Sequence, residues 1–405
     1  MTKMYISAIV LSLLVMDKLA AQTVNTGELV VLTGTQFSTV SDFNNKPTGD
    51  FVNDGKFLVY ANYNNDGLVT YTPAIVTGLT HFKGLSGAQT ISGSAWSDFH
   101  NIQFENATTQ PAFLLSGDIK VRGNSNFNSG IVANDDLGGA FVFESNATHE
   151  NTNNDSYVDG IVERKGKNQF QFPIGSANFF RPLAIGQTNL ANNVFKSRYL
   201  LENSNTLYPH HQKYLLINLI DDAEYWELKS NQTTVNVPLT LTWNSDTTPI
   251  AITAGDAQSS IAIVRWDVNE SKWKYYSTAI DLNQQTATAL VDKDGIFTLG
   301  RIKVASVLPS DIVVYNAVSP NGDGLNDYFH ISGLESAPDN SLMIFNRWGN
   351  QVYETKGYGV NGNWFRGIAE GKGEKQLPSG TYFYVLKYKM ADGTDKDKVG
   401  YLYID

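Results

Sequence analysis

Residues 319–331, SPNGDGLNDYFHI, gather oxygen-bearing side chains in a short loop. Calcium prefers such oxygens, and an EF-hand loop needs them at positions 1, 3 and 5, with glycine at 6 and glutamate at 12. With Asn321 as the first position, Asp323 fits the third, but the fifth, sixth and twelfth carry Leu, Asn and Ser. The EF-hand pattern therefore fails. A looser calcium site is the alternative, with the candidate ligands Asn321, Asp323, Asn326 and Asp327.

Two other interpretations of the same loop need no metal. Gly322 and Gly324 supply the positive φ that tight turns require, while Asn321 and Asp323 can hydrogen-bond to their own backbone. The loop can also be an address that another protein reads. Turn chemistry accounts for the glycines but does not require so particular a string, so these alternatives stay open at the level of the loop alone.

Catalytic constellations are missing elsewhere. HExxH, GxSxG and HxH spacings do not occur, and the adjacent His210 and His211 point to opposite faces of a strand. We therefore predict no catalytic residue. The enzymatic alternative is a carbohydrate-active β-helix with carboxylates and an arginine along a groove. Its candidates are Asp135, Asp136, Asp155, Asp159 and Arg164, of which the first three sit in strings typical of solvated turns.

The elements that must position these residues are strands. Short runs of alternating apolar and polar residues lie between Asn, Gly and Asp clusters, as in KFLVYANY (56–63), AFVFES (140–145) and TYFYVLKYK (381–389). Alternation with period two indicates strands that are half-buried on sheets. The chain is therefore predicted to be all-β. The acidic string DDAEYWELK (221–229) is the one place where we expect a helical turn.

The chain divides into regions that differ in composition and in the pattern of apolar residues. Residues 22–187 repeat short apolar runs that favour a β-solenoid, although no strict period can be counted and a sandwich or barrel stays open. Residues 188–303, rich in Trp, are predicted to form a β-sandwich. Residues 304–310 form a linker, in which Pro309 breaks any ladder. The six or seven short strands expected in 311–405 are typical of a small immunoglobulin-like sandwich.

The string QFQFPIGSANFFRPLAIG (169–186) is the most distinctive feature of the N-terminal half. Its prolines suggest a segment that caps the repetitive region and ends a sheet edge. For Phe179, Phe180 and Arg181 we favour core packing over contact with a ligand.

The composition and the N-terminal residues limit the cellular location and the partners that we expect for this protein. Lys3, an apolar run from Met4 to Met16 and the small residues before Gln22 are typical of a secretory signal peptide (1–21). The net charge of −10 repels phosphate backbones, so nucleic acid is not expected as a partner. There are no cysteines, which excludes disulfides and also the lipid-bearing cysteine of bacterial lipoproteins.

Three C-terminal blocks carry a family resemblance: SPNGDGLNDYF (319–329), SLMIFNRWGNQVYE (341–354) and LPSGTYFYVLKY (377–388), followed by KVGYLYID. In order and spacing they resemble the type B C-terminal sorting domain of Bacteroidota type IX secretion substrates, the gliding motility-associated kind. The resemblance covers residues 310–405. It implies that the signal peptide leads to the periplasm, and that the folded C-terminal domain is then read by the type IX translocon in the outer membrane.

The resemblance also implies partners and site residues. Members of this type resemble substrates that dock on an outer-membrane β-barrel of the PorP/SprF type, which would retain a protein without a lipid anchor. In the hairpin 341–355, Arg347 and Trp348 are expected at the tip, with burial of Trp348 in its own domain as the alternative. The residues expected to act in sorting or partner binding are Pro320, Asn321, Gly322, Asp323, Gly324, Asn326, Asp327, Phe345, Asn346, Arg347, Trp348, Gly349, Gly380, Thr381, Tyr382 and Tyr384.

The sequence thus predicts a secreted binding or structural protein at the cell surface or outside the cell, either an adhesin or a component of a surface assembly. A secreted carbohydrate-active enzyme with the same export domain is the alternative. Calcium is the one cofactor considered. An extracellular glycan or surface is the expected ligand class.

Overall fold

The computed structural model describes residues 22–214, 216–254, 259–303, 312–323, 326–334, 337, 339–360, 362–369, 375–389 and 395–405. The expected signal peptide (1–21) and linker (304–310) lie outside these ranges. Within them nearly all regular structure is strand, and the helical pieces are η1 (Ser204–Thr206) and α1 (Ile250–Thr253). The prediction of an all-β chain is confirmed. No helix of the described residues has the length and apolarity needed to cross a membrane.

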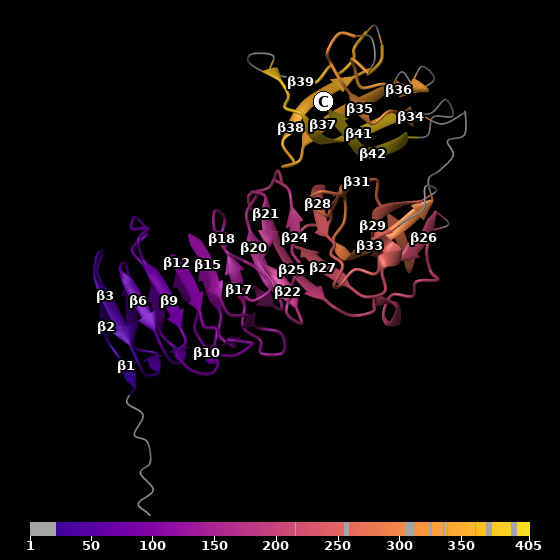
Figure 1. Cartoon of the computed structure of the whole chain (residues 1–405). Coiled ribbons are helices and arrows are strands. Elements are labelled where there is room, and N and C mark those ends of the chain that lie inside the picture. Colours follow the sequence, from indigo (N-terminus) through magenta and orange to yellow (C-terminus); the bar gives the residue numbers. More distant parts are fainter. Residues whose placement is uncertain are drawn as a thin grey trace, which may run out of the picture.

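The N-terminal region is a β-solenoid, so the open choice between solenoid and sandwich is decided for the solenoid (Figure 1). Successive coils contribute one strand each to three sheets, and neighbouring coils pair in parallel. Along the first sheet run β1 (Thr23–Asn25), β4 (Phe43–Asn45), β7 (Tyr63–Asn65), β10 (Gln89–Ser92), β13 (Phe113–Leu115), β16 (Val132–Ala133), β19 (Val158–Asp159), β22 (Ile174–Ser176) and the antiparallel β23 (Phe179–Phe180).

The other two sheets complete each coil. The second contains β2 (Glu28–Val31), β5 (Asp50–Asn53), β8 (Leu68–Thr70), β11 (Ser97–Phe99), β14 (Ile119–Val121), β17 (Phe141–Phe143) and β20 (Val162–Lys165). The third contains β3 (Gln36–Thr39), β6 (Lys56–Val59), β9 (Leu79–Lys83), β12 (Asn101–Glu105), β15 (Asn124–Ser129) and β18 (Thr148–Glu150).

A ladder of buried asparagines joins the first three coils. Asn25 Nδ2 donates to Asn45 Oδ1 over 2.8 Å, and Asn45 Nδ2 donates to Asn65 Oδ1 over 2.8 Å. The three residues are 20 positions apart, and β1, β4 and β7 pair in the same register. Gly49 lies against this ladder, where a Cβ atom would be 2.1 Å from Asn45 Oδ1. The first coils therefore do follow a strict period, which the sequence analysis missed.

The interior of the solenoid is aromatic. Inward-facing rings of successive coils lie over one another, as in Phe37 on Phe57 with centroids 5.3 Å apart and Phe43 on Tyr63 at 5.7 Å. Each coil can bury its inward face only against its neighbours, so stacking supplies the core that a single coil lacks.

The solenoid continues without a break into a β-sandwich. The second solenoid sheet is extended by antiparallel strands, namely β25 (Val194–Leu200), β27 (Tyr225–Ser230), β33 (Gly295–Lys303), β29 (Ser259–Asp267), β30 (Lys272–Tyr275) and β26 (Ile217–Ile220), the last of which pairs with β33. A five-stranded sheet faces it, formed by β21 (Phe170–Phe172), β24 (Leu183–Ile185), β28 (Val237–Thr242), β32 (Thr286–Val291) and β31 (Thr278–Asp281). One hydrophobic core runs from Val31 to Leu299, across the boundary expected at residue 187.

The expected helical turn at 221–229 is wrong. Residues Tyr225–Ser230 form β27, where Trp226 and Leu228 point into the core and Glu227 points out. Pairing with β25 on one side and β33 on the other favours the extended backbone over the weak helical preference of the acidic string.

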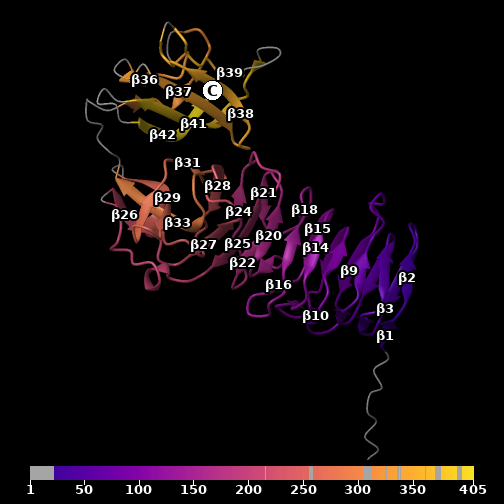
Figure 2. The ribbon, with the colours of Figure 1, turned by 180° about the vertical axis from the view of Figure 1, so that it is seen from behind.

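The C-terminal domain has its own core. Its five-stranded sheet has the order β35 (Ala317–Val318), β42 (Asp395–Ile404), β41 (Gly380–Lys389), β37 (Asn340–Asn346) and β38 (Gln351–Lys356). Two small pairs accompany it, formed by β34 (Val313–Val314) with β36 (Ile331–Ser332) and by β39 (Ile368–Ala369) with β40 (Lys375–Gln376). The immunoglobulin-like assignment stays a prediction. In both views of the ribbon this domain lies beside the sandwich and away from the first coils (Figures 1 and 2).

Candidate functional site

The loop around Asn321 is held by its own hydrogen bonds. Asn321 Nδ2 donates to Asp323 Oδ2 over 2.9 Å, the Asp323 N–H donates to Asn321 Oδ1 over 3.0 Å, and the Gly322 N–H donates to Asp327 Oδ1 over 2.7 Å. Gly322 has a φ of +79°. The turn chemistry expected for these residues is therefore present, whereas Gly324 lies outside the described residues.

The four calcium candidates are near one another in this loop. Asn326 has a φ of +56°, and its carbonyl accepts the Ser319 N–H over 2.7 Å, just before Pro320. Oxygens of Asn321, Asp323 and Asp327 accept the bonds described above, so an ion would compete with the loop's own donors. No group of three His, Cys, Asp or Glu side chains suited to a metal occurs within the described ranges. Calcium binding by this loop stays a prediction.

The second set of candidates forms a hairpin tip. β37 and β38 pair around a turn, with Phe345 and Asn346 at the end of β37 and Arg347, Trp348 and Gly349 in the turn itself. Asn346 Oδ1 accepts the Trp348 N–H over 2.9 Å. The Trp348 ring is 40% exposed, and the Arg347 guanidinium lies 4.4 Å from its centroid. Of the two alternatives for Trp348, the structure has the ring outside the core of its own domain.

The third set lies on β41, in the middle of the C-terminal sheet. Tyr382 and Tyr384 are buried in the domain core, and burial raises the pKa of Tyr384 above its usual range. Tyr382 Oη donates to the Pro378 carbonyl over 2.9 Å. Gly380 and Thr381 are half-buried at the start of the strand. The structure therefore separates the expected sorting residues into a loop, a hairpin tip and a strand, and two of them are core residues.

The arginine of the enzymatic alternative is buried, and its carboxylates differ in exposure. The Asp135 and Asp159 backbones are hydrogen-bonded, and burial, with the neighbouring Asp135 charge, raises the pKa of Asp159. Arg164, by contrast, is 1% exposed and lies inside the solenoid, with its guanidinium 5.0 Å from the Phe170 ring. Burial lowers the pKa of Arg164 to about 10. Arg164 is therefore not exposed to a surface groove, while Asp136 and Asp155 are exposed.

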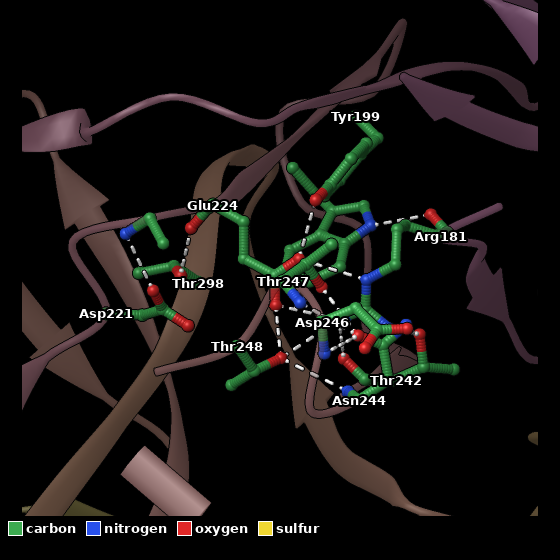
Figure 3. A network of polar contacts seen from close by, with 12 residues as sticks. Arg181, Tyr199, Asp221, Glu224, Thr242, Asn244, Asp246, Thr247, Thr248 and Thr298 are labelled. Atoms are coloured by element: carbon green, nitrogen blue, oxygen red, sulfur yellow. Dashed lines mark hydrogen bonds and ion pairs between the residues drawn. The ribbon is translucent and has the colours of Figure 1, made fainter. Parts of the chain in front are cut away.

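Arg181 is the centre of a buried polar network (Figure 3). Its Nε and Nη2 atoms donate to the two carboxylate oxygens of Glu224 over 2.9 and 2.8 Å, and its Nη1 atom donates to Thr242 Oγ1 over 2.9 Å. Tyr199 Oη donates to Glu224 over 2.7 Å, and Thr248 Oγ1 also donates to it. Arg181 is 2% exposed and Glu224 0%. The network therefore joins the end of the solenoid to the sandwich. Arg181 is buried as expected, whereas Phe179 and Phe180 on β23 are half-buried.

Asp221 lies at the edge of this network. Unlike Glu224, whose two carboxylate oxygens are both hydrogen-bonded, Asp221 has one carboxylate oxygen without a partner in the described part of the chain. Its Oδ1 atom accepts the Ala223 N–H over 2.9 Å, while Oδ2 is buried and has no hydrogen-bond partner among the described residues. Burial, followed by the charge of Glu224, raises the pKa of Asp221 to about 8. Asp221 is 0% exposed, so we relate its titration to the stability of the fold.

Sequence reasoning missed a patch on the outer face of the second solenoid sheet. The Lys120 ammonium lies 4.6 Å from the centroid of Trp96, which is 41% exposed. Two residues further along each of these coils, Arg122 Nη2 and Asp98 Oδ2 form an ion pair at 3.0 Å. The rings of Tyr71 and His100 meet edge to face, with their centroids 5.1 Å apart. These six residues, which we name the aromatic patch, come from three coils. The sequence feature that could have revealed this patch is Trp96, which directly precedes β11 in the coil before that of Lys120.

Together, the fold and the C-terminal domain define an all-β protein with a separate terminal module. Residues 312–404 match the family model of the CHU_C type IX secretion signal domain, so this part of the chain is a type IX sorting domain. This match confirms the resemblance to type IX secretion substrates that the three C-terminal sequence blocks indicated. The domain implies export of the chain out of the cell. No curated protein matches the chain.

Proposed function

We propose that the chain is a surface-displayed binding protein, in which the solenoid and sandwich form the passenger (22–303) and the sorting domain serves export and attachment. The observation that carries the binding role is the aromatic patch. An exposed Trp beside cationic side chains and an ion pair is suited to sugars, because sugar rings stack on aromatic faces and their hydroxyls bond to charged groups. The ligand class is therefore an extracellular glycan or a glycan-coated surface.

The proposal also includes an outer-membrane partner. The sorting domain presents Trp348 with Arg347 at a hairpin tip, and Trp and Arg are the residue types most often found as anchors in protein interfaces. A β-barrel of the PorP/SprF type is the partner that would hold this tip at the cell surface. A chain without cysteine needs an attachment other than an N-terminal lipid.

The binding role is tested with the mature full chain on immobilised glycans and on intact surfaces. Trp96→Ala and Arg122→Ala should each weaken retention by about tenfold or more, as expected when an anchor aromatic or a paired charge is lost. Tyr214→Ala is the matched control, because Tyr214 is also 40% exposed but lies on the sandwich. Equal retention of all three variants would overturn the patch, and release of soluble sugar products would favour the enzymatic alternative.

The attachment is tested in cells. A chain that lacks 312–404 should stay inside the outer membrane, whereas the full chain should reach the surface and co-purify with a barrel from detergent-solubilised membrane. Trp348→Ala should reduce co-purification while Trp96→Ala leaves it unchanged. Full-length protein found free in the medium would show that the domain serves export and not attachment.

A further inference from the structure

The sheet of the sorting domain has two apolar faces. Its inner face carries Leu342, Ile344, Leu386, Leu402 and Ile404, which form the domain core. Because side chains alternate along strands, the other face carries Phe345 on β37, Phe383 and Val385 on β41, and Val399 and Tyr403 on β42. Phe383 is only 1% exposed although it does not belong to the domain core. Something outside this domain therefore covers the second face.

The passenger provides the cover. The outer face of the sheet β24–β28–β32–β31 lies against the second face of the sorting sheet, with contacts from β31 and β32 to β42. On the passenger side the centre of this face is polar, since Thr240 Oγ1 and Thr288 Oγ1 are 2.8 Å apart across β28 and β32. At one end the Gln187 N–H donates to the Trp348 carbonyl, so the hairpin tip is part of the same contact. We name this contact the seam.

The seam is incompletely closed. A cavity of about 570 Å³ lies between Phe345 and Val399 of the sorting domain and Leu290 of the passenger, and another of about 490 Å³ lies between Phe383 and Thr288. A third, of about 350 Å³, lies where Trp348 approaches Thr240. These three hollows open to solvent, so water rather than protein contacts part of each facing surface. The seam is thus unlike either core that it joins.

We propose that the seam is a reversible intramolecular complex in which the passenger covers the second face and the hairpin tip of the sorting domain until the type IX secretion machinery takes its place. An apolar face set against threonine rows and cavities gains little from closure, and contacts between domains of one chain commonly resemble transient interfaces. The surface released on opening is aromatic at Phe345, Phe383 and Tyr403. The claim that the passenger competes with a partner rests on the proposed export and attachment role, whereas the claim that the seam opens does not.

The absence of native cysteine allows a direct test of opening on the purified chain. Thr381→Cys places a single thiol at the seam, where Thr381 lines the cavity beside Phe383. Thr240→Arg together with Thr288→Arg inserts two cations into the passenger side, and Tyr403→Arg opens the seam from the sorting side at a position that is 47% exposed. Thr90→Arg is the control, a half-buried strand threonine on the solenoid.

We expect the thiol to react at least about tenfold faster in either opened variant than in the parent or the Thr90→Arg control, with unchanged circular dichroism. Two independent variants guard against a folding defect in one of them. Equal rates in all four proteins would overturn the closed seam.

A second readout concerns the covering role. In cells the opened variants should appear at the surface after a shorter delay than the parent, and an equal or longer delay with confirmed opening would overturn the claim that the passenger competes with a partner. Thiol reactivity is measured without any export machinery. A failure of the proposed attachment, seen with the chain that lacks 312–404, is therefore distinguishable from a failure of the seam.

Discussion

At the scale of single residues, the ion pair of Arg181 with Glu224 decides how the solenoid ends. Glu224→Gln removes the negative charge and leaves the buried guanidinium uncompensated, so it should lower the free energy of unfolding by roughly 3–5 kcal/mol. The measurement is chemical denaturation followed by tryptophan fluorescence. One of the seven tryptophans is Trp226, whose Nε1 donates to the Arg181 carbonyl over 2.9 Å.

The control for this prediction is an exposed pair. Lys196 is 53% exposed and lies 3.0 Å from Glu163, so Lys196→Ala should cost less than about 1 kcal/mol. Similar losses for the two variants would contradict the view that burial makes the difference. The double change Arg181→Met with Glu224→Leu should cost less than Glu224→Gln alone, because it leaves no buried charge unpaired.

Asp221 should make stability depend on pH. Its folded pKa of about 8 lies above the ordinary value of 3.8, so the folded state keeps a proton that the unfolded state releases. The free energy of unfolding therefore falls as pH rises through this window, and the penalty is fully present above it. Asp221→Asn should remove that part of the decline, on the order of a few kcal/mol between pH 5 and 8.

The test of this sign is a series of denaturation curves across that range. Asp222→Asn is the matched control, because the neighbouring Asp222 side chain is exposed. The parent and the Asp222→Asn variant should lose stability in parallel with rising pH, while the Asp221→Asn curve stays flatter. A decline of equal slope in all three proteins would mean that Asp221 is ionised in the folded state.

At the scale of elements, the asparagine ladder fixes the first three coils. Asn45→Ala removes bonds to Asn25 above and to Asn65 and the Leu68 carbonyl below, and leaves buried groups without partners. The local opening free energy of residues 23–70 should fall by roughly 2–4 kcal/mol. Amide hydrogen exchange measures it strand by strand. Asn44→Ala, on the half-buried outer side of the same strand, should leave exchange within β1, β4 and β7 unchanged.

The strands themselves were predictable and their partners were not. The apolar-rich runs at residues 56–59 and 380–389 became β6 and β41 because a preference for strand is a local property of the sequence, whereas their burial on both faces depends on distant segments. The 20-residue period of Asn25, Asn45 and Asn65 was readable as well, but a longer connection between β8 and β9 hides it in later coils. Arg181 and Glu224 are 43 positions apart, and no pattern of spacing joins them.

The same holds for the candidate sites: features carried by continuous sequence were predictable, and features that depend on contacts between distant residues were not. The sorting domain was predictable because three blocks of sequence occur in family order within 312–404. The aromatic patch was not, since Trp96 meets Lys120, and Tyr71 meets His100, only when coils of unequal length stack. The seam was equally invisible, because the second face of β41 reads as an ordinary solvated face until another sheet covers Phe383.

At the scale of the whole molecule, stacking predicts that the passenger tolerates loss of a complete coil but not of half a coil. Removing residues 42–61 joins Ser41 to Asn62 and brings β1, β2 and β3 against β7, β8 and β9 in the existing register, since Thr23, Phe43 and Tyr63 occupy equivalent positions. Each coil contacts only its neighbours, so the shortened chain should fold, with one interface fewer.

Removing only residues 52–61 should have the opposite effect, because it deletes β6 and part of β5 and leaves the inward faces of the first and third coils unmatched. We expect the 42–61 deletion to give a cooperative unfolding transition and normal surface delivery, since the sorting domain lies far from these coils (Figure 2). The 52–61 deletion should expose residues 22–51 to protease while the sandwich stays resistant. Equal protease resistance of the two shortened chains would show that the coils are not the units in which this passenger is built.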